Sequence, residues 1–259
     1  MGIDFDTLII YYLYFLVFIF GVTVGSFLNV VIYRVPAGIS IVYPGSSCPA
    51  CGEPLKWQQL IPVISYLWQR GKCSSCQTAI SPQYITIELL TGLIYIAIFY
   101  SYSISLTTVA YWLLAPALLA LSIIDWRHLI IPDKINGYIF ILGLLASIAG
   151  ATIPLTEALL GSIVGGGVLL LLAVLSRGGM GGGDIKLIFG LGLFTGWQLN
   201  LLLLFIAATA GSIYGIGKIA ISKERKGKHI PFGPFLAVAG IIVLQWGWDI
   251  LNYYLTTFY

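Results

Sequence analysis

Charged residues are scarce in this sequence. Only 9% of its 259 residues are Asp, Glu, Lys or Arg, whereas 59% are hydrophobic and the mean hydropathy is +0.96. This composition excludes an ordinary soluble globular protein. The small net charge of +3 gives no indication of nucleic-acid binding. We expect instead an integral membrane protein.

Apolar runs recur along the chain at roughly 8–33, 84–100, 106–124, 136–153, 157–175, 187–220 and 233–256. Several approach the ~20 residues that cross a bilayer core of ~30 Å. The basic residues predict the orientation, because cytoplasmic loops are enriched in Lys and Arg. All 13 fall on one side if the 187–220 run crosses twice, although hydropathy alone also allows one long span there. The sequence therefore predicts an all-α polytopic membrane protein of about eight transmembrane helices, with both termini outside the cytoplasm.

Cysteine is absent from every predicted span. The four cysteines lie in the one long polar segment as Cys48-Pro-Ala-Cys51 and Cys73-Ser-Ser-Cys76, with 21 residues between the two pairs. This spacing is typical of a four-thiolate zinc site, although the gap is slightly long. Disulfides or free thiols are the alternative, and a reducing cytoplasm disfavours the disulfides. Because so short a segment has little core, we expect the metal to stabilise it rather than to catalyse.

These features predict three parts of the chain. Residues 1–33 form the first transmembrane segment, and it is expected to stay in the protein because Asp4 and Asp6 stand where a signal peptide has basic residues. Residues 34–83 form a small cytoplasmic zinc-binding loop domain. Residues 84–259 form the membrane core.

A carboxylate follows a run of glycines in the stretch RGGMGGGDIKL at 177–187. Acidic residues at membrane depth are costly, so Asp184 is a candidate functional residue. Its partner could be Asp125, which ends an apolar run, or Asp133, which follows Pro132. We favour Asp125, because it continues a span, whereas Asp133 can cap the next helix.

Two carboxylates at one site cannot both ionise cheaply, so one holds a proton while the other is anionic. Such a pair can activate water and protonate a leaving amine, which is the chemistry of an aspartic peptidase. The glycines would allow an unwound backbone to approach an extended substrate. The alternative is a set of interfacial salt bridges, with Asp184 paired to Lys186 and Asp125 to Arg127 or Arg177.

Several motifs, in order along residues 21–237, are similar to those of one family. They are GSFLNVVIYRVP (25–36), the two cysteine pairs, IPVISYLWQRGKC (61–73), ELLTG (88–92), IDWRHLIIPD (124–133), GMGGGDIKL (179–187) and IPFGPFLA (230–237). In these motifs the chain resembles the type IV prepilin peptidases. One small departure is QQLIP (58–62), where relatives often have Asn before Ile-Pro.

The resemblance implies a polytopic aspartic peptidase of the bacterial inner (cytoplasmic) membrane that removes the short basic leader of type IV prepilins and pseudopilins at the cytoplasmic face. Many members also methylate the new N-terminal amine with S-adenosylmethionine, and we expect the zinc-binding loop to help form that second site. By their positions in matching motifs, Asp125 and Asp184 would be the catalytic pair and Asp133 a supporting residue. The zinc ligands would be Cys48, Cys51, Cys73 and Cys76.

Three other functions compete with this interpretation. A presenilin-like intramembrane aspartic protease shares Gly-x-Gly-Asp but does not account for the cysteines. A proton-coupled transporter also uses buried carboxylates, although the chain shows no inverted repeat. A purely structural zinc-loop scaffold is the third alternative. The sequence gives no indication of oligomeric state.

Overall fold

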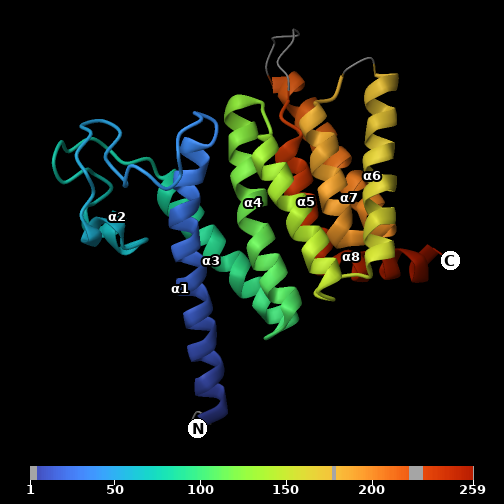
Figure 1. Ribbon diagram of the computed structural model, residues 1–259, viewed down its shortest axis with the longest axis horizontal. Coiled ribbons are helices and arrows are strands. Elements are labelled where there is room, and N and C mark those ends of the chain that lie inside the picture. Colours follow the sequence, from blue (N-terminus) through green and yellow to red (C-terminus); the bar gives the residue numbers. More distant parts are fainter. Residues whose placement is uncertain (1–4, 177–178, 222–229, 259) are drawn as a thin grey trace. The chain divides into compact units, whose positions relative to one another are not determined.

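The computed structural model describes residues 5–176, 179–221 and 230–258 (Figure 1). They belong to two compact units, Met1–Ile104 and Ser105–Tyr259. The described residues form helices and loops with only two isolated β-bridges, which confirms the predicted all-α class. Arg177, the basic residues of 222–229, and Asp4 lie outside the described residues, so the charge argument for orientation stays a prediction.

Two long helices pack together in the first unit. They run antiparallel, because Tyr14 contacts Phe99 edge-on while Gly21, further along the first helix, faces Gly92, which precedes Phe99 in the second. A Cβ added to Gly21 would lie 2.9 Å from the Gly92 Cα atom, so the two backbones approach closely. Small residues at such crossings are typical of helix pairs in membranes. The helices are α1 (Phe5–Arg34) and α3 (Gln83–Tyr102).

The polar segment between α1 and α3 contains only short helices, η1 (Trp57–Leu60) and α2 (Ile64–Trp68). Its first turns are held by Arg34, the last residue of α1. The Arg34 guanidinium donates hydrogen bonds to the carbonyl oxygens of Ser40 (3.0 Å) and Pro44 (2.8 Å). These bonds satisfy backbone acceptors that no helix or sheet covers.

The second unit contains five helices, α4 (Leu106–His128), α5 (Asp133–Ile148), α6 (Leu155–Leu175), α7 (Gly182–Ile221) and α8 (Gly233–Phe258). Local sequence determines where several of them begin and end. The Ser105 side chain accepts a hydrogen bond from the Thr108 backbone N–H at the start of α4 (3.2 Å), which is a typical N-cap. Leu129 ends α4 in the left-handed conformation (φ 55°), and Pro132 then directs the chain into α5.

Helix α7 is two helical segments that meet at Gly196, whose φ of 72° and ψ of −179° are not helical. The Asn200 side-chain amide donates to the carbonyl oxygen of Ile188 at 3.2 Å and to that of Gly161 in α6 at 3.0 Å. Residues 12 apart in a straight helix would be separated by ~18 Å. The chain therefore turns back at Gly196, as two crossings by the 187–220 run require (Figure 1).

Glycines bring α6 and α7 together. A Cβ on Gly161 would lie 2.6 Å from the carbonyl oxygen of Gly192, and one on Gly165 would overlap the Asn200 side chain. Gly161 and Gly165 therefore allow close packing of α6 on α7. Six of the described helices are long and apolar enough to cross a membrane, namely α1, α3, α4, α6, α7 and α8. The protein is therefore multi-spanning, while the count of eight crossings stays a prediction.

Candidate active site and metal centre

Asp125 is in the last turn of α4 and is almost completely buried, with 5% of its surface exposed. Its Oδ2 atom accepts a hydrogen bond from the backbone N–H of Gly233, the first residue of α8, at 2.9 Å. The contact leaves no room for a side chain, because a Cβ on Gly233 would lie 2.8 Å from the same oxygen. The end of one helix and the start of another therefore hold this carboxyl group.

Asp184 is in the first turn of α7 and is also buried, with 9% exposed. Its Oδ1 atom has no hydrogen-bond partner, although almost all buried polar atoms in proteins have one. The two carboxyl groups are near enough for the charges of Asp125 and Asp184 to interact. The structure thus brings together the two carboxylates that the sequence favoured as a pair, with one oxygen atom unused.

Ile131 packs between the elements that position the two carboxyl groups. Its Cβ atom lies 2.9 Å from where a Cβ of Gly183 would be, and its Cδ1 atom 3.1 Å from the corresponding position on Gly233. Gly183 directly precedes Asp184, and Gly233 donates to Asp125. A single apolar side chain between α4 and α5 therefore sets the spacing between the starts of α7 and α8.

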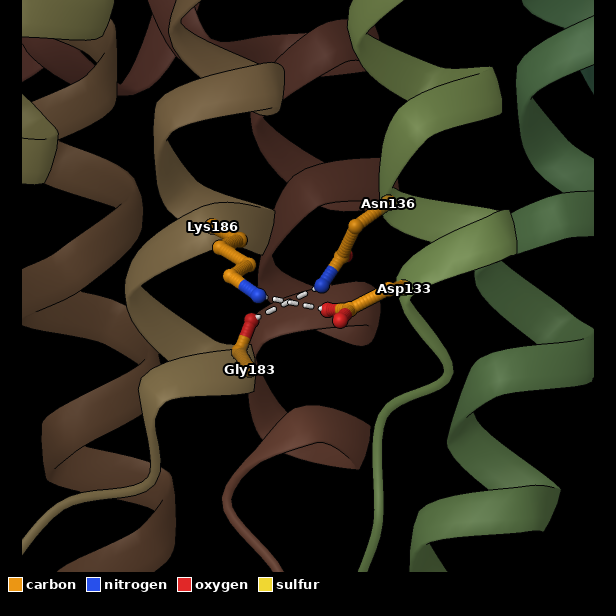
Figure 2. Close-up of polar contacts among 4 residues, drawn as sticks. All are labelled: Asp133, Asn136, Gly183 and Lys186. Atoms are coloured by element: carbon orange, nitrogen blue, oxygen red, sulfur yellow. Dashed lines mark hydrogen bonds and ion pairs between the residues drawn. The ribbon is translucent and has the colours of Figure 1, made fainter.

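Two polar contacts connect the start of α5 to the start of α7, as Figure 2 shows. The Lys186 ammonium forms a 2.7 Å salt bridge with Asp133. The Asn136 side-chain amide donates to the carbonyl oxygen of Gly183 at 3.1 Å. Asn136 is 4% exposed, whereas both members of the salt bridge are largely exposed. The buried contact fixes the peptide group directly before Asp184.

Three expectations change with this geometry. Lys186 pairs with Asp133, so the alternative in which Lys186 neutralises Asp184 is wrong. Asp133 is the first residue of α5 and not its cap, which is Pro132. The unwound glycine backbone is shorter than expected, because Gly182 and Gly183 already belong to α7. Close packing against Ile131 explains the small residue at Gly183.

The four cysteine sulfur atoms lie within 4.8 Å of one another. The Sγ atoms of Cys48 and Cys76 are 3.9 Å apart. Tetrahedral ligation with zinc–sulfur distances of about 2.3 Å would place sulfurs ~3.8 Å apart, so the donors fit such an ion. All four are free cysteines, and the disulfide alternative does not describe this arrangement.

The two cysteine pairs have the same backbone fold. The Cys48 N–H donates to the Glu53 carbonyl oxygen at 3.0 Å, and the Cys48 carbonyl oxygen accepts from the Gly52 N–H at 2.8 Å. Cys73 repeats both bonds with Thr78 and Gln77, each at 2.9 Å. Each turn is closed by a residue of positive φ, which is 73° at Gly52 and 58° at Gln77. Such paired turns present two thiols each to one point.

Hydrogen bonds prepare some of these thiols to ionise. The side-chain hydrogen bond with Thr78 lowers the pKa of Cys76 to about 6. Backbone N–H groups of Cys51 and Ala50 lower the pKa of Cys48. At Cys51 the N–H of Glu53 also lowers the pKa, but desolvation and the neighbouring sulfurs outweigh it and raise the pKa to about 11. A cation that replaces the protons would remove this repulsion.

The sequence matches two families of known proteins, the bacterial peptidase A24 N-terminal domain over residues 19–102 and the type IV leader peptidase family over residues 112–216. A prepilin leader peptidase/N-methyltransferase of Aeromonas salmonicida (strain A449) is 36% identical over 277 residues, which cover 95% of both chains. The chain belongs to the type IV leader peptidase family. This confirms the resemblance inferred from the motifs.

Other members of the family with the same name are similar along most of the chain. The Pseudomonas aeruginosa protein is 36% identical over 263 residues, 91% of both chains. The Neisseria gonorrhoeae protein is 35% identical over 270 residues, 92% of this chain and 93% of the relative. No solved structure matches the chain. The leader peptidase match includes Asp125 and Asp184, and the N-terminal match includes all four cysteines.

Sequence reasoning missed three residues of this site. Gly233 stands in the IPFGPFLA motif, Ile131 lies within the IDWRHLIIPD motif, and Asn136 follows that second motif without belonging to it. The only signal for Gly233 was a glycine beside proline at the start of an apolar run. Nothing local in the sequence pairs it with Asp125, which is 108 residues away.

Proposed function

We propose that this protein is a membrane aspartic peptidase that removes the leader peptide from type IV prepilins and pseudopilins and then methylates the new N-terminal amine. The observation that supports it most strongly is the pair of buried carboxyl groups, Asp125 at the end of α4 and Asp184 at the start of α7, in a chain of this family. The names of the relatives, prepilin leader peptidase/N-methyltransferase, agree with both activities.

In this proposal Asp125 and Asp184 share one proton. The ionised carboxyl group removes a proton from a water molecule, and the resulting nucleophile attacks the carbonyl carbon of the scissile peptide. The protonated carboxyl group donates its proton to the departing amine. The unpartnered Oδ1 atom of Asp184 is suited to accept the hydrogen bond of that water. The Gly233 N–H keeps the Asp125 carboxyl group oriented throughout.

We propose zinc as the ion held by Cys48, Cys51, Cys73 and Cys76. All four protein ligands of a tetrahedral ion would then be thiolates, with no position left for water, so the ion would be structural. Its role would be to hold the two cysteine turns together in the segment 34–83. The methyl donor of the second activity would be S-adenosylmethionine, which supplies a methyl group on a positively charged sulfur.

The proposed setting is the bacterial inner membrane, with eight crossings, the loop 34–83 on the cytoplasmic side and both termini outside. Residues 1–33 would form the first crossing, and residues 84–259 would contain the peptidase core. The α7 reversal at Gly196 supports two crossings in one stretch. The substrate's apolar helix would lie in the bilayer, with its basic leader in the cytoplasm.

The direct test is incubation of the detergent-solubilised protein with a purified prepilin and S-adenosylmethionine, followed by mass spectrometry of both products. We expect loss of the leader mass and an N-methyl increment on the mature chain. Cleavage within an apolar helix rather than at its cytoplasmic end would favour the presenilin-like alternative. Absence of any cleavage would refute the peptidase and return the transporter to consideration.

A further inference from the structure

A third buried carboxyl group lies in the unit Met1–Ile104, whereas Asp125 and Asp184 belong to the unit Ser105–Tyr259. Glu88 in the second turn of α3 is 6% exposed, and Asn29 on α1 is 4% exposed. The cleavage mechanism proposed above uses neither residue. Both are polar side chains buried inside a mostly apolar helix pair, so each needs an explanation.

Glu88 is held by neutral donors alone. Its Oε2 atom accepts a hydrogen bond from the Val63 backbone N–H at 2.7 Å, and the Ser26 side chain also hydrogen-bonds to it. Among the residues that the structure describes, no Lys, Arg or His lies within salt-bridge distance of Glu88. A buried carboxylate without a cation is costly, because its charge is removed from water and not neutralised.

Asn29 leaves an acceptor unused. Its side-chain amide donates to the carbonyl oxygens of Gly25 (3.3 Å) and Tyr84 (3.2 Å), and its Oδ1 atom is buried without a partner. The bond to Tyr84 connects α1 to α3. A side chain of a helix leans toward the N-terminus of that helix, so Glu88 leans toward Tyr84 and hence toward the level of Asn29.

The cluster therefore has acceptors in excess of donors. The Glu88 carboxylate and the Asn29 Oδ1 atom can both accept further hydrogen bonds from N–H or O–H groups, and a positive charge would also stabilise the Glu88 carboxylate. A buried acceptor without a donor costs free energy that a suitable ligand would recover on binding. A protonated primary amine supplies both requirements, since it has three N–H donors and one positive charge.

We propose that Glu88 and Asn29 bind the free N-terminal amine of the cleaved substrate for its methylation. This inference rests on the proposed methyltransferase function and names the residues that hold its acceptor. The cleavage pair belongs to the other compact unit, Ser105–Tyr259. Cleavage and methylation are thus assigned to different residues.

The chemistry balances with Glu88 as the base. The bound ammonium gives one proton to the Glu88 carboxylate and becomes a neutral amine with a free electron pair. That pair forms the new nitrogen–carbon bond to a methyl group on a sulfonium donor, and the carbon–sulfur bond breaks with its electrons left on sulfur. The products are a secondary ammonium and a neutral thioether. Glu88 and Asn29 then face the N–H groups that remain.

Val63 connects this cluster to the cysteine segment. It is a β-branched residue with φ of 61° and ψ of −55°, a conformation that such residues rarely adopt. Strained positions of this kind persist when surrounding contacts hold them, and here the Glu88 carboxyl group holds the Val63 N–H. The expected contribution of the segment 34–83 to the methylation site thus acquires a specific contact.

The test uses the full-length protein and two measurements. The first compares binding of a cleaved pilin product with a free amine and of its N-acetylated form to the wild-type protein, by fluorescence anisotropy. The second compares cleavage and methylation rates in Glu88→Gln, which keeps an acceptor for Val63. Glu157→Gln is the matched control, because Glu157 is an exposed carboxylate in the first turn of α6.

We expect the wild type to bind the free amine more tightly than the acetylated product, by about tenfold or more for a charged hydrogen bond. Glu88→Gln should remove this preference and lower the methylation rate by about tenfold or more. The cleavage rate should fall less than twofold. Glu157→Gln should behave as the wild type in both measurements.

Equal binding of the two products by the wild type would overturn the proposal without any variant. Methylation by Glu88→Gln at the wild-type rate would overturn it as well. Loss of cleavage together with methylation in Glu88→Gln alone would assign Glu88 a structural role and not an amine site. A wild-type protein that cleaves but never methylates would instead refute the methyltransferase function itself.

Discussion

A methyl group on Gly233 tests how the site holds Asp125. In Gly233→Ala the new Cβ would lie 2.8 Å from the Asp125 Oδ2 atom and 3.1 Å from the Ile131 Cδ1 atom. Carbon–oxygen contacts are normally no shorter than about 3.3 Å, so the carboxyl group must move by about 0.5 Å. That shift would stretch the 2.9 Å hydrogen bond from the Gly233 N–H beyond the normal range of about 2.7–3.2 Å.

The size of the effect follows from that bond. A hydrogen bond to a charged group contributes about 1.5–3 kcal/mol, and its loss would orient Asp125 poorly for proton transfer. Because about 1.4 kcal/mol of activation free energy corresponds to a factor of ten in rate, kcat should fall about 10- to 150-fold. The affinity for prepilin should change little, since Asp125 and Gly233 are both buried.

The assay is steady-state cleavage of a purified prepilin by the solubilised protein, followed by mass spectrometry, with Tm measured in the same detergent. Gly137→Ala is the matched control, because a Cβ on Gly137 in α5 would meet no atom within 4 Å. We expect wild-type kcat in that control. A wild-type kcat in Gly233→Ala would refute the role of this contact, and a large fall in Tm would show that the substitution acts on folding.

Three further predictions concern the contacts around Asp184 and the cysteines. Asn136→Ala should lower kcat about tenfold, because it frees the buried Gly183 carbonyl and loosens the peptide before Asp184; unchanged kinetics would contradict this. Lys186→Met should change Tm and cleavage only slightly, because an exposed salt bridge contributes at most about 1 kcal/mol; a hundredfold loss of cleavage would show a role beyond that bridge. Removal of metal by a strong chelator should expose the cysteine segment to protease and release one zinc ion per chain; intact resistance with no zinc released would contradict a structural zinc site.

Much of the fold follows from local patterns in the sequence. Apolar runs of span length predict helices because a chain in lipid must satisfy its backbone groups internally. The two Cys-x-x-Cys pairs predict a common site because each pair needs only a tight turn. The sequence favours Asp125 and Asp184 as partners because a carboxylate beside an apolar span is too costly to be incidental. Each of these features is recognised from residues within a few positions of one another, although the predicted sites combine features that lie far apart in the chain.

The contacts that the sequence did not reveal are long-range and involve ordinary groups. The N–H that binds Asp125 belongs to the backbone of Gly233, and every residue except proline has such a group. The Asn136 contact with Gly183 spans 47 residues. The sequence does not predict the pairing of Asp133 with Lys186, because Lys186 stands nearer to Asp184 in sequence. Only packing decides between such partners.

The unusual backbone conformations of two other residues could not be predicted from the sequence either. Gly196 lies in a run that hydropathy describes equally well as one long helix, and the reversal there is fixed by the contacts of Asn200 with Ile188. Val63 has a positive φ that its residue type does not suggest. Its N–H donates to the Glu88 carboxyl group, which is 25 residues away and becomes a neighbour only after the chain has folded.

The central claim is that Asp125 and Asp184 together cleave prepilins, and isosteric substitutions test it most directly. Cleavage of one purified prepilin should be measured by mass spectrometry for Asp125→Asn, Asp184→Asn and, as the matched control, Asp133→Asn, all at the same concentration. The Tm of each variant should be measured as well, so that a loss of folding is distinguished from a loss of catalysis. General acid–base groups contribute about 100- to 10,000-fold to the rate of a reaction. Each of the first two variants should therefore cleave at least about 100-fold more slowly than the wild type, whereas the control should retain most of its activity. Cleavage near the wild-type rate by either Asp125→Asn or Asp184→Asn would contradict the account.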